Sequence, residues 1–471
     1  MTGVAGRFAN FRLADSGAQA VLAVLCLYGL FSFPGVAGRW GFSLVGIVIL
    51  PLWLGAAALA VPLLRAMPSR RRLALLAILA IALRMAFALL SVHRGSNGDP
   101  NAYLLLAKGL LIRDEYGIYE PYFGGYWRAL FPPFYSFLLA GWGAIAGFST
   151  ASVLFLGTVI DLGAASLMIQ LGRRFGNEGA GRGAAWLYLI WPSVLFSAPL
   201  AQKEGLCAFL ILALALAWMN RDHRVWRDAV KIGVPAALLA LTQPGQAPLA
   251  ALFGLFLIGQ AGFFTILAAG LRAACIALLV MLPWWVRNWL IFGVFMPLTS
   301  AGGASLWIGN NPEATGNWMP PPEHLRGLPE MVYSKRIGAI AVEWIKANPG
   351  AFIRLTITKF LRACGVASFG ITRLVAMQPP LPAAFAAALL PMSYLTHVAL
   401  LVTSAIAVRI RRMPGTPTLL LLIAACGVQL MLFGVWFEFG ERHREFVTPF
   451  LLLLVCGMIA PRLESGEPTP S

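Results

Sequence analysis

The sequence has little charge for its length. Asp, Glu, Lys and Arg make up only 12% of its 471 residues, which is about half of the share usual in soluble proteins. A soluble chain of this length would need polar surface for several domains. The shortage of charge therefore excludes an ordinary cytosolic enzyme and a disordered protein. Because 59% of the residues are hydrophobic, we predict an all-α polytopic membrane protein.

Cysteine and histidine are also scarce. The six cysteines form no CxxC pair, and no histidine lies at ligand spacing from any of them. This excludes a disulfide scaffold and indicates small buried apolar residues. The five histidines are scattered without an HxxxH pattern. We predict no metal ligands from spacing, and the one cofactor left open is a divalent cation held by Asp99 and a neighbouring acid.

Negative charge is scarcer than positive charge. The chain has 36 Lys and Arg against 19 Asp and Glu, a net charge of +17. In a soluble protein this excess would suggest nucleic acid, but no basic run is interleaved with aromatic residues as nucleic-acid binding requires. In a membrane protein the excess marks cytoplasmic loops that face anionic lipid. We expect the lipid bilayer as a partner, and no nucleic acid.

Apolar stretches that suit membrane spans recur along the chain, and we predict about twelve transmembrane helices. Residues 133–148 form a further short stretch that opens with Pro-Pro and either crosses the membrane or lies at its surface. Four arginine clusters fall on one side of the membrane if this stretch does not cross, which favours an interfacial or re-entrant position. The predicted spans are 17–36, 42–64, 73–92, 151–171, 184–200, 205–219, 232–241, 246–258, 263–283, 384–408, 418–437 and 447–460.

This orientation gives two long segments on the non-cytoplasmic side. Because long loops in compact proteins are usually functional or disordered, and these contain aromatic residues and tight turns, we expect both to be ordered. Residues 343–361 have the pattern of a basic amphipathic helix lying on the bilayer. The expected units are two extra amino-terminal spans (1–72), a seven-span module (73–283) with a first outer loop (93–132), a second outer region (284–383), carboxy-terminal spans (384–460) and a cytoplasmic tail (461–471).

Asp99 is the first candidate for chemistry. It follows a predicted span in a Gly-Asp-Pro sequence, with Tyr103 one helical turn further on. A carboxylate at the edge of the bilayer, made more basic by burial, suits a general base for an acceptor delivered from that side. The alternative is a helix cap, because Asp accepts backbone N–H bonds and Pro is tolerated in the first turn. Both roles are compatible.

A second candidate group follows the span that ends at residue 283. Arg287 and Asn288 come directly after two tryptophans typical of a membrane interface, and Asn310 and Asn311 mark a later turn. An arginine held beside aromatic rings suits the phosphate of a lipid-linked donor. The alternative for Arg287 is simple snorkelling to the lipid headgroups.

Two more charged groups occur in short outer turns. Residues 438–445 form a dense charged segment, in which Arg442 or Arg444 could face the same phosphate as Arg287; the alternative is a solvated turn with weak local ion pairs. Lys203 could help to hold that phosphate and Glu204 could orient the site. For this pair, capping of the helix that follows is the alternative.

Arg84 and Asp161 are isolated charges inside predicted spans. Such residues rarely face lipid and usually pair or line a polar cavity. We predict that they pair with each other and hold two spans together.

Several motifs resemble one known family. They are Arg84 in its span, Asp99-Pro-Asn-Ala-Tyr103 with Ala107, Pro132-Pro133-Phe-Tyr135, residues 171–176 (LGRRFG), residues 239–244 (LALTQP), Pro283-Trp-Trp-Val-Arg-Asn288, residues 306–316 (LWIGNNPEATG) and Glu441-Arg-His-Arg444 followed by Thr448-Pro-Phe450. Together they resemble the GT-C superfamily of membrane glycosyltransferases, which take sugars from polyprenyl-phosphate donors, in its protein O-mannosyltransferase, aminoarabinose-transferase and rhizobial lipopolysaccharide-transferase branches. The resemblance covers about residues 73–460, and the PWxxRN and IGNNPxATG motifs are its most specific part.

The resemblance implies a seven-span catalytic module whose first outer loop carries an essential Asp, here Asp99. It also implies a polyprenyl-monophosphate sugar as donor and transfer at the periplasmic face of a bacterial inner membrane. The family usually has Asp-Glu at the catalytic position, whereas this chain has Asp99-Pro100, so the resemblance supports no second acid there. At the family's Arg-Pro or Lys-Gly break this chain has Gln243-Pro244 and lacks the basic residue.

The predicted reaction is transfer of the sugar with inversion. Asp99 would deprotonate an acceptor hydroxyl of a lipid, glycan or protein, while Arg287, Arg442 and Lys203 stabilise the leaving phosphate. Tyr103, Asn288, Glu204, Asn310, Asn311 and Arg444 are the supporting candidates. The alternative function is a transporter or flippase of a lipid-linked sugar, which predicts inverted repeats with broken helices in both halves; the sequence has one such break, at residues 242–245.

Overall fold

The computed structural model describes residues 2–40, 44–65, 69–91, 98–219, 225–375, 377, 379–380, 382–410 and 412–460. This part of the chain is almost entirely helical, as predicted. The helices of the first half are α1 (Thr2–Trp40), α2 (Leu44–Ala58), α3 (Ala60–Arg65), α4 (Arg70–Ser91), α5 (Asp99–Arg113), α6 (Pro133–Ala146), α7 (Thr150–Arg174), α8 (Glu178–Leu189), α9 (Pro192–Ser197) and α10 (Glu204–Trp218).

The second half continues the helical architecture. Its helices are α11 (Trp226–Ala240), α12 (Leu249–Phe256), α13 (Ile258–Ala261), α14 (Phe263–Phe292), α15 (Gly302–Gly309), α16 (Glu330–Ala347), α17 (Pro349–Gly365), α18 (Phe369–Val375), α19 (Ala383–Ala407), α20 (Thr416–Gln429) and α21 (Thr448–Ile459), with the short turns η1 (Pro244–Gln246), η2 (Glu323–Leu325), η3 (Leu430–Gly434) and η4 (Glu441–Val447). Strands β1 (Ile118–Glu120) and β2 (Gly125–Trp127) form one antiparallel hairpin, with Ile118 opposite Trp127.

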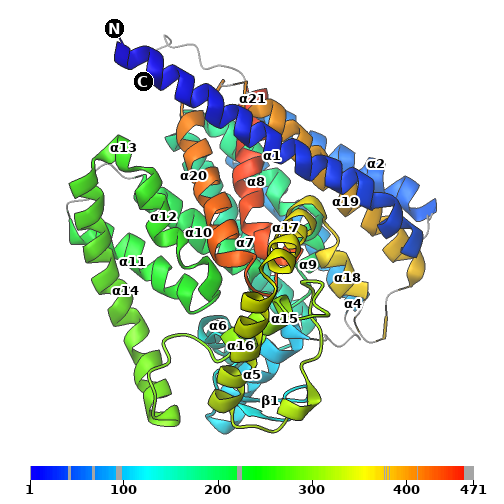
Figure 1. Cartoon of the computed structure of the whole chain (residues 1–471). Helices are drawn as coiled ribbons and strands as arrows, with labels where there is room; N and C mark the ends of the chain where they lie inside the picture. The colour runs from blue at the N-terminus through cyan, green and yellow to red at the C-terminus, as the bar shows by residue number, and fades with distance from the viewer. Residues whose placement is uncertain are drawn as a thin grey trace.

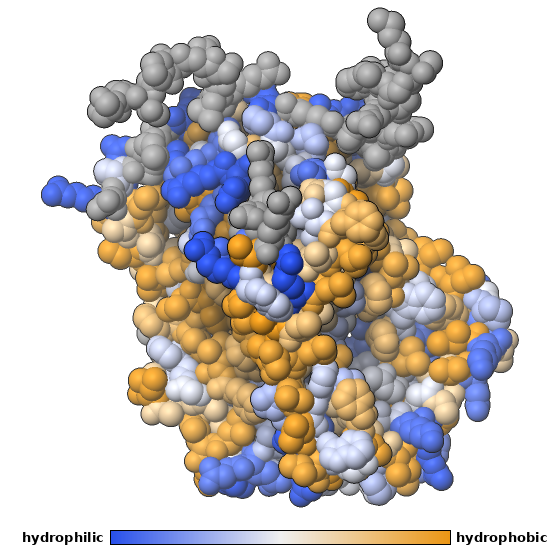
Figure 2. All heavy atoms as spheres, turned by 90° about the vertical axis from the view of Figure 1, so that its left-hand side faces the viewer, coloured by the Kyte–Doolittle hydropathy of each residue, from blue (hydrophilic) through white to orange (hydrophobic). Residues whose placement is uncertain are grey.

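The chain is a multi-pass membrane protein. Within the described residues, six helical segments are long and apolar enough to cross a membrane: Ser16–Gly35, Val48–Arg65, Thr150–Arg174, Phe263–Phe292, Ala383–Ala407 and Thr416–Gly434. Figure 2 shows one face of the molecule, where hydrophobic residues cover a broad area and hydrophilic residues gather toward the upper and lower edges. The count of about twelve spans stays a prediction.

Several predicted spans form shorter helices than the sequence suggested. The predicted span 184–200 is divided into α8 and α9, because Pro192 begins a new helix after Trp191 adopts an extended conformation. The break predicted at residues 242–245 is confirmed, since α11 ends at Ala240, Pro244 begins η1, and α12 starts at Leu249. Residues 133–148 contain the 14-residue helix α6.

The single amphipathic helix predicted for residues 343–361 is wrong. The structure has two helices there, α16 and α17, which meet at Asn348. Asn348 leaves the helical conformation, with φ of −133° and ψ of 55°, because Pro349 crowds the residue before it and has no N–H for an α-helical hydrogen bond. Pro349 then serves as the first residue of α17, a position where proline is favoured.

The two predicted outer segments pack together into an ordered unit. Figure 1 shows α5, β1, α15 and α16 gathered at one end of the molecule, below helices α8 and α20. Phe123 and Trp127 from the first segment share a small core with Trp307 and Tyr333 from the second. The buried carboxylate of Glu330 accepts hydrogen bonds from the N–H groups of residues 128 and 129 and from the hydroxyl of residue 300.

The predicted pair of Arg84 and Asp161 is confirmed. The Arg84 guanidinium lies 2.5 Å from the Asp161 carboxylate, and it is fully buried. Arg84 also donates two hydrogen bonds to the carbonyl of Leu189, and Asp161 accepts one from the hydroxyl of Tyr188. The pair thus joins α4, α7 and α8, and every polar atom is engaged as burial requires.

Candidate functional site

Asp99 stands at the start of α5, with its side chain turned toward another part of the chain. The cap position of α5 is Gly98, whose φ of 65° favours glycine, and no side chain caps the helix. The Asp99 carboxylate instead forms a hydrogen-bonded ion pair with the guanidinium of Arg442. The capping alternative for Asp99 is therefore not what the structure shows.

Arg442 connects Asp99 to the charged segment 438–445. A second guanidinium nitrogen of Arg442 lies 3.7 Å from the Glu438 carboxylate. The Arg442 side chain is 13% exposed and that of Asp99 is 26% exposed. The pair is thus partly desolvated and still open to a small ligand.

Lys203, Glu204 and Tyr103 also belong to the site around Asp99. The Lys203 ammonium is buried and lies 5.5 Å from the centre of the Tyr103 ring. Among the described residues it has no hydrogen-bond or ion-pair partner. Lys203 and Glu204 begin α10, but neither side chain caps that helix, and Oε2 of Glu204 and the Tyr103 hydroxyl are buried without hydrogen-bond partners.

The cations dominate the electrostatics of Asp99. Burial alone would raise the pKa of Asp99, but Arg442, Lys203 and Arg373 outweigh it and hold the pKa at about 2. Burial lowers the pKa of Lys203. Burial and the neighbouring cations Arg442 and Lys203 also keep the pKa of His443 well below its usual value. The site at neutral pH thus contains an ionised carboxylate, two guanidinium groups and a neutral imidazole.

The segment 438–445 is not a solvated turn with only local ion pairs. Glu441 accepts hydrogen bonds from the N–H and hydroxyl of Ser368 and the N–H of Phe369, at the start of α18. Glu445 accepts a 2.7 Å hydrogen bond from the hydroxyl of Ser193. Glu441 and Glu445 therefore tie the segment to α18 and α9, and the ion pair between Arg442 and Asp99 ties it to α5.

Arg444, a predicted supporting residue, faces away from Asp99. Its guanidinium is buried and donates hydrogen bonds to the carbonyls of Ala363 and Val366 and contacts Nδ1 of His397. These contacts join η4 to α17 and α19.

Arg287 and Asn288 do not join the Asp99 cluster. Arg287 donates 2.8 Å hydrogen bonds to the carbonyls of Arg128 and Tyr116, and its guanidinium lies 4.7 Å from the Trp284 ring. Asn288 is buried and donates to the carbonyl of Met296. Arg287 therefore anchors the first outer loop to α14, and it is neither a free snorkelling side chain nor a neighbour of Asp99.

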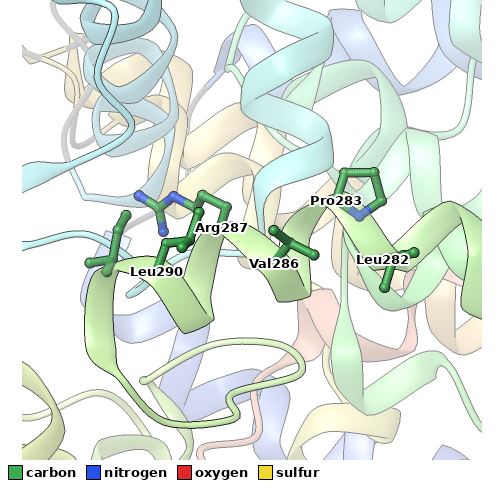
Figure 3. A pocket seen from close by; sticks show the side chains of 6 residues that line it. Leu282, Pro283, Val286, Arg287 and Leu290 are labelled. Carbon is green, nitrogen blue, oxygen red and sulfur yellow. The ribbon is translucent and has the colours of Figure 1, made fainter.

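Arg287 also borders an apolar surface of α14. Figure 3 shows its side chain beside Val286 and Leu290, with Leu282 and Pro283 further along the same helix. Leu290 is 77% exposed. This surface is suited to contact lipid chains.

The side chains of Asn310 and Asn311 form hydrogen bonds with backbone carbonyls. Asn310 donates hydrogen bonds to the carbonyls of Leu306 and Trp436, and Asn311 donates to the carbonyl of Trp307. The buried ammonium of Lys359 donates to the carbonyls of Gly309 and Phe437. The IGNN motif and Lys359 together hold the turn residues that lead to Glu438.

The structure adds Arg373, Glu438 and His443 to the predicted residues. Arg373 lies on α18 and lowers the pKa of Asp99, 274 positions away in the chain. The sequence TRLV offers no signal for this role, because only the tertiary packing of α18 brings Arg373 to α5. His443 and Glu438 lie within or beside the charged segment that the sequence did single out.

The Asp99 cluster is poorly suited to a divalent cation. In the described part of the chain, no three His, Cys, Asp or Glu side chains are grouped so that they could hold a metal ion. Arg442 and Lys203 already surround Asp99, and their positive charge would repel a second cation.

No protein-family model and no curated protein matches the sequence. Among solved structures, the Archaeoglobus fulgidus oligosaccharyltransferase in its apo form is 16% identical, with a TM-score of 0.48 over 81% of this chain and 49% of that one. The chain thus spans about half the length of that protein. ArnT from Cupriavidus metallidurans, bound to undecaprenyl phosphate, is 11% identical, with a TM-score of 0.42 over 83% of this chain and 78% of that one. Both TM-scores are below 0.5.

Proposed function

We propose that the protein is an inverting glycosyltransferase that moves a sugar from a polyprenyl-phosphate donor to an acceptor hydroxyl. The observation that carries this proposal is the partly exposed Asp99–Arg442 pair together with the buried Lys203 ammonium, which has no hydrogen-bond or ion-pair partner among the described residues. This cluster lies at the ends of α5 and α10, where the apolar helices meet the packed outer segments. It therefore combines a carboxylate, an anion-binding surface and access for a membrane-bound substrate.

The donor phosphate would bind Arg442 and Lys203. A buried cation without an acceptor is costly, so an anionic ligand next to Lys203 would restore the missing interaction. When the bond between the anomeric carbon and the phosphate oxygen breaks, the phosphate gains negative charge. Cations fixed in place before the reaction stabilise that charge without reorganising.

Asp99 would act as the general base. A carboxylate with a pKa of about 2 is a weak base, and among its neighbours Arg442 lowers that pKa most. A bound phosphate would draw on Arg442 and place a negative charge next to Asp99, and both changes raise its pKa. Asp99 then accepts the proton of the acceptor hydroxyl, the acceptor oxygen bonds to the anomeric carbon from the opposite face, and the polyprenyl phosphate leaves.

Of the three residues predicted to bind the donor phosphate, Arg442 and Lys203 keep that role and Arg287 takes another. Arg287 already donates to two backbone carbonyls, so it would act by anchoring the first outer loop. Asn310, Asn311 and Arg444 would position the segment that carries Arg442. We place the site on the periplasmic side of a bacterial inner membrane, with a lipid, glycan or protein as acceptor, because the arginine clusters of the sequence favour that orientation.

The direct test is a transfer assay on the purified protein in liposomes. Radiolabelled polyprenyl-phosphate sugars are added with a membrane extract as the source of acceptors. Label that appears on an acceptor supports the proposal, whereas label that crosses the bilayer while still attached to its lipid supports a flippase. If the label stays on the donor and does not move, the enzyme function proposed here is wrong.

A further inference from the structure

A third cation faces the Asp99 cluster from a helix that no sequence motif pointed to. The Arg373 guanidinium lies 5.8 Å from the centre of the Phe369 ring, and that of Arg442 lies 6.0 Å from the centre of the same ring. One aromatic ring thus contacts both guanidinium groups. Such contacts orient a guanidinium by its planar face and leave its N–H edges for other ligands.

Arg373 also lies against the start of α5. Its Nη1 atom is 2.9 Å from the position that a Cβ would take on Gly98. A side chain at residue 98 would therefore compete with Arg373 for space directly beside Asp99. Glycine at this position serves the positive φ of the backbone and the close approach of the arginine together.

The helix that carries Arg373 is held in place on two sides. Glu441 accepts three hydrogen bonds at the start of α18, from Ser368 and Phe369, where a negative charge is favourable for a helix. On the other side, a Cβ on Gly370 would lie 3.0 Å from the carbonyl oxygen of Ser193 in α9. This close fit fixes α18 on α9 and sets the direction of Arg373.

Arg373 has no hydrogen-bond or ion-pair partner of its own in the part of the chain that the structure describes. Its charge reaches both Asp99 and Glu438, yet Arg442 forms the ion pairs with these two carboxylates. Arg373 and the buried Lys203 thus both act on Asp99, and neither has a hydrogen-bond acceptor among the described residues. Cations in such a setting are suited to bind an anion through charge-assisted hydrogen bonds.

We propose that Arg373 binds the phosphate of the lipid donor together with Lys203 and Arg442, as a third anion-binding residue of this site. The proposal rests on the proposed function for the identity of the ligand. The guanidinium of Arg373 would donate hydrogen bonds to phosphate oxygens on the side of the site that α5 forms. In this arrangement the Phe369 ring contacts both guanidinium groups that would bind the phosphate.

The test measures binding without transfer, with farnesyl phosphate as probe and farnesol as its uncharged counterpart. A charge-assisted hydrogen bond contributes enough that Arg373→Ala should weaken the affinity for farnesyl phosphate about 10-fold or more, with little change for farnesol. Arg373→Lys should lose less, because it keeps the charge but not the bidentate geometry. Arg354→Ala is the matched control, since Arg354 is an exposed arginine on α17.

The outcomes separate this proposal from the wider function. If the wild type binds farnesyl phosphate and Arg373→Ala binds it equally well, Arg373 is not part of the anion site, whatever the transfer assay shows. Equal losses for farnesyl phosphate and farnesol would also overturn the proposal, because they would indicate a change in shape and not a lost anion contact. If Arg373→Ala does not fold, Arg373→Gln, which retains a hydrogen-bonding amide without the charge, replaces it in the same comparison.

Discussion

Neutralising Asp99 should strengthen phosphate binding while it removes catalysis. The Asp99 carboxylate forms an ion pair with Arg442, so it would compete with an incoming phosphate for that guanidinium. Asp99→Asn keeps the size of the side chain and removes its charge. The cations then have one fewer internal partner, and we expect the variant to bind farnesyl phosphate more tightly than the wild type.

The size of the effect follows from the pKa of Asp99. The decrease from 3.8 to about 2 means that the surroundings favour the ionised carboxylate by about 2 kcal/mol, at about 1.36 kcal/mol per pKa unit. A phosphate at the same cations recovers part of that interaction. We expect about 10-fold tighter binding, which corresponds to about 1.4 kcal/mol.

Titration of the detergent-solubilised protein with farnesyl phosphate, followed by tryptophan fluorescence, measures this change. Asp114→Asn is the matched control, because Asp114 is exposed at the opposite end of α5 and its loss changes the net charge equally. Weaker or unchanged binding by Asp99→Asn, relative to Asp114→Asn, would refute the competition between Asp99 and the phosphate.

Three further predictions concern other parts of the structure. Arg84→Ala leaves Asp161 buried without its cation and should lower the free energy of unfolding by about 3–5 kcal/mol, seen as a lower thermal midpoint; an unchanged midpoint would mean that the pair does not hold α4 to α7. Burial and then Arg362 lower the pKa of Lys359 from 10.5 to about 7, so the unfolded chain binds more protons between these pH values and the free energy of unfolding should rise with pH across that window; Lys359→Met should lose this rise, and an equal rise in both proteins would contradict the assignment. Glu441→Gln should weaken the hydrogen bonds that hold α18 and so reduce farnesyl phosphate affinity several-fold, smaller than the effect of Arg373→Ala; no loss of affinity would show that α18 needs no such anchor.

The sequence predicted the features that depend on local composition. Low charge and long apolar runs indicated a polytopic helical protein, and two isolated charges in predicted spans indicated the pair of Arg84 and Asp161, because lone charges in apolar surroundings must find partners. The Pro-Gly pair at residues 244–245 also predicted the turn there, because proline ends a helix and glycine permits a turn. The division of α16 from α17 at Pro349 is equally local, because a proline restricts the residue before it, although the amphipathic pattern continues across this position.

The sequence could not show which charges meet. Arg442, Arg444 and Arg287 are all arginines beside aromatic residues, yet one pairs with Asp99, one binds carbonyls of α17 and its flank, and one anchors the first outer loop. These differences arise from the packing of helices far apart in the chain. No sequence motif marked Arg373, because its position near Asp99 depends on how Glu441 and α9 hold α18.

The most direct test of the account is sugar transfer by Asp99→Asn beside the wild type and Asp114→Asn, with radiolabelled polyprenyl-phosphate sugar and equal amounts of folded protein in liposomes. The account predicts that label reaches an acceptor with the wild type and with Asp114→Asn, and that none is transferred by Asp99→Asn. Transfer by Asp99→Asn at the wild-type rate would contradict the claim that this carboxylate is the base of a glycosyltransferase.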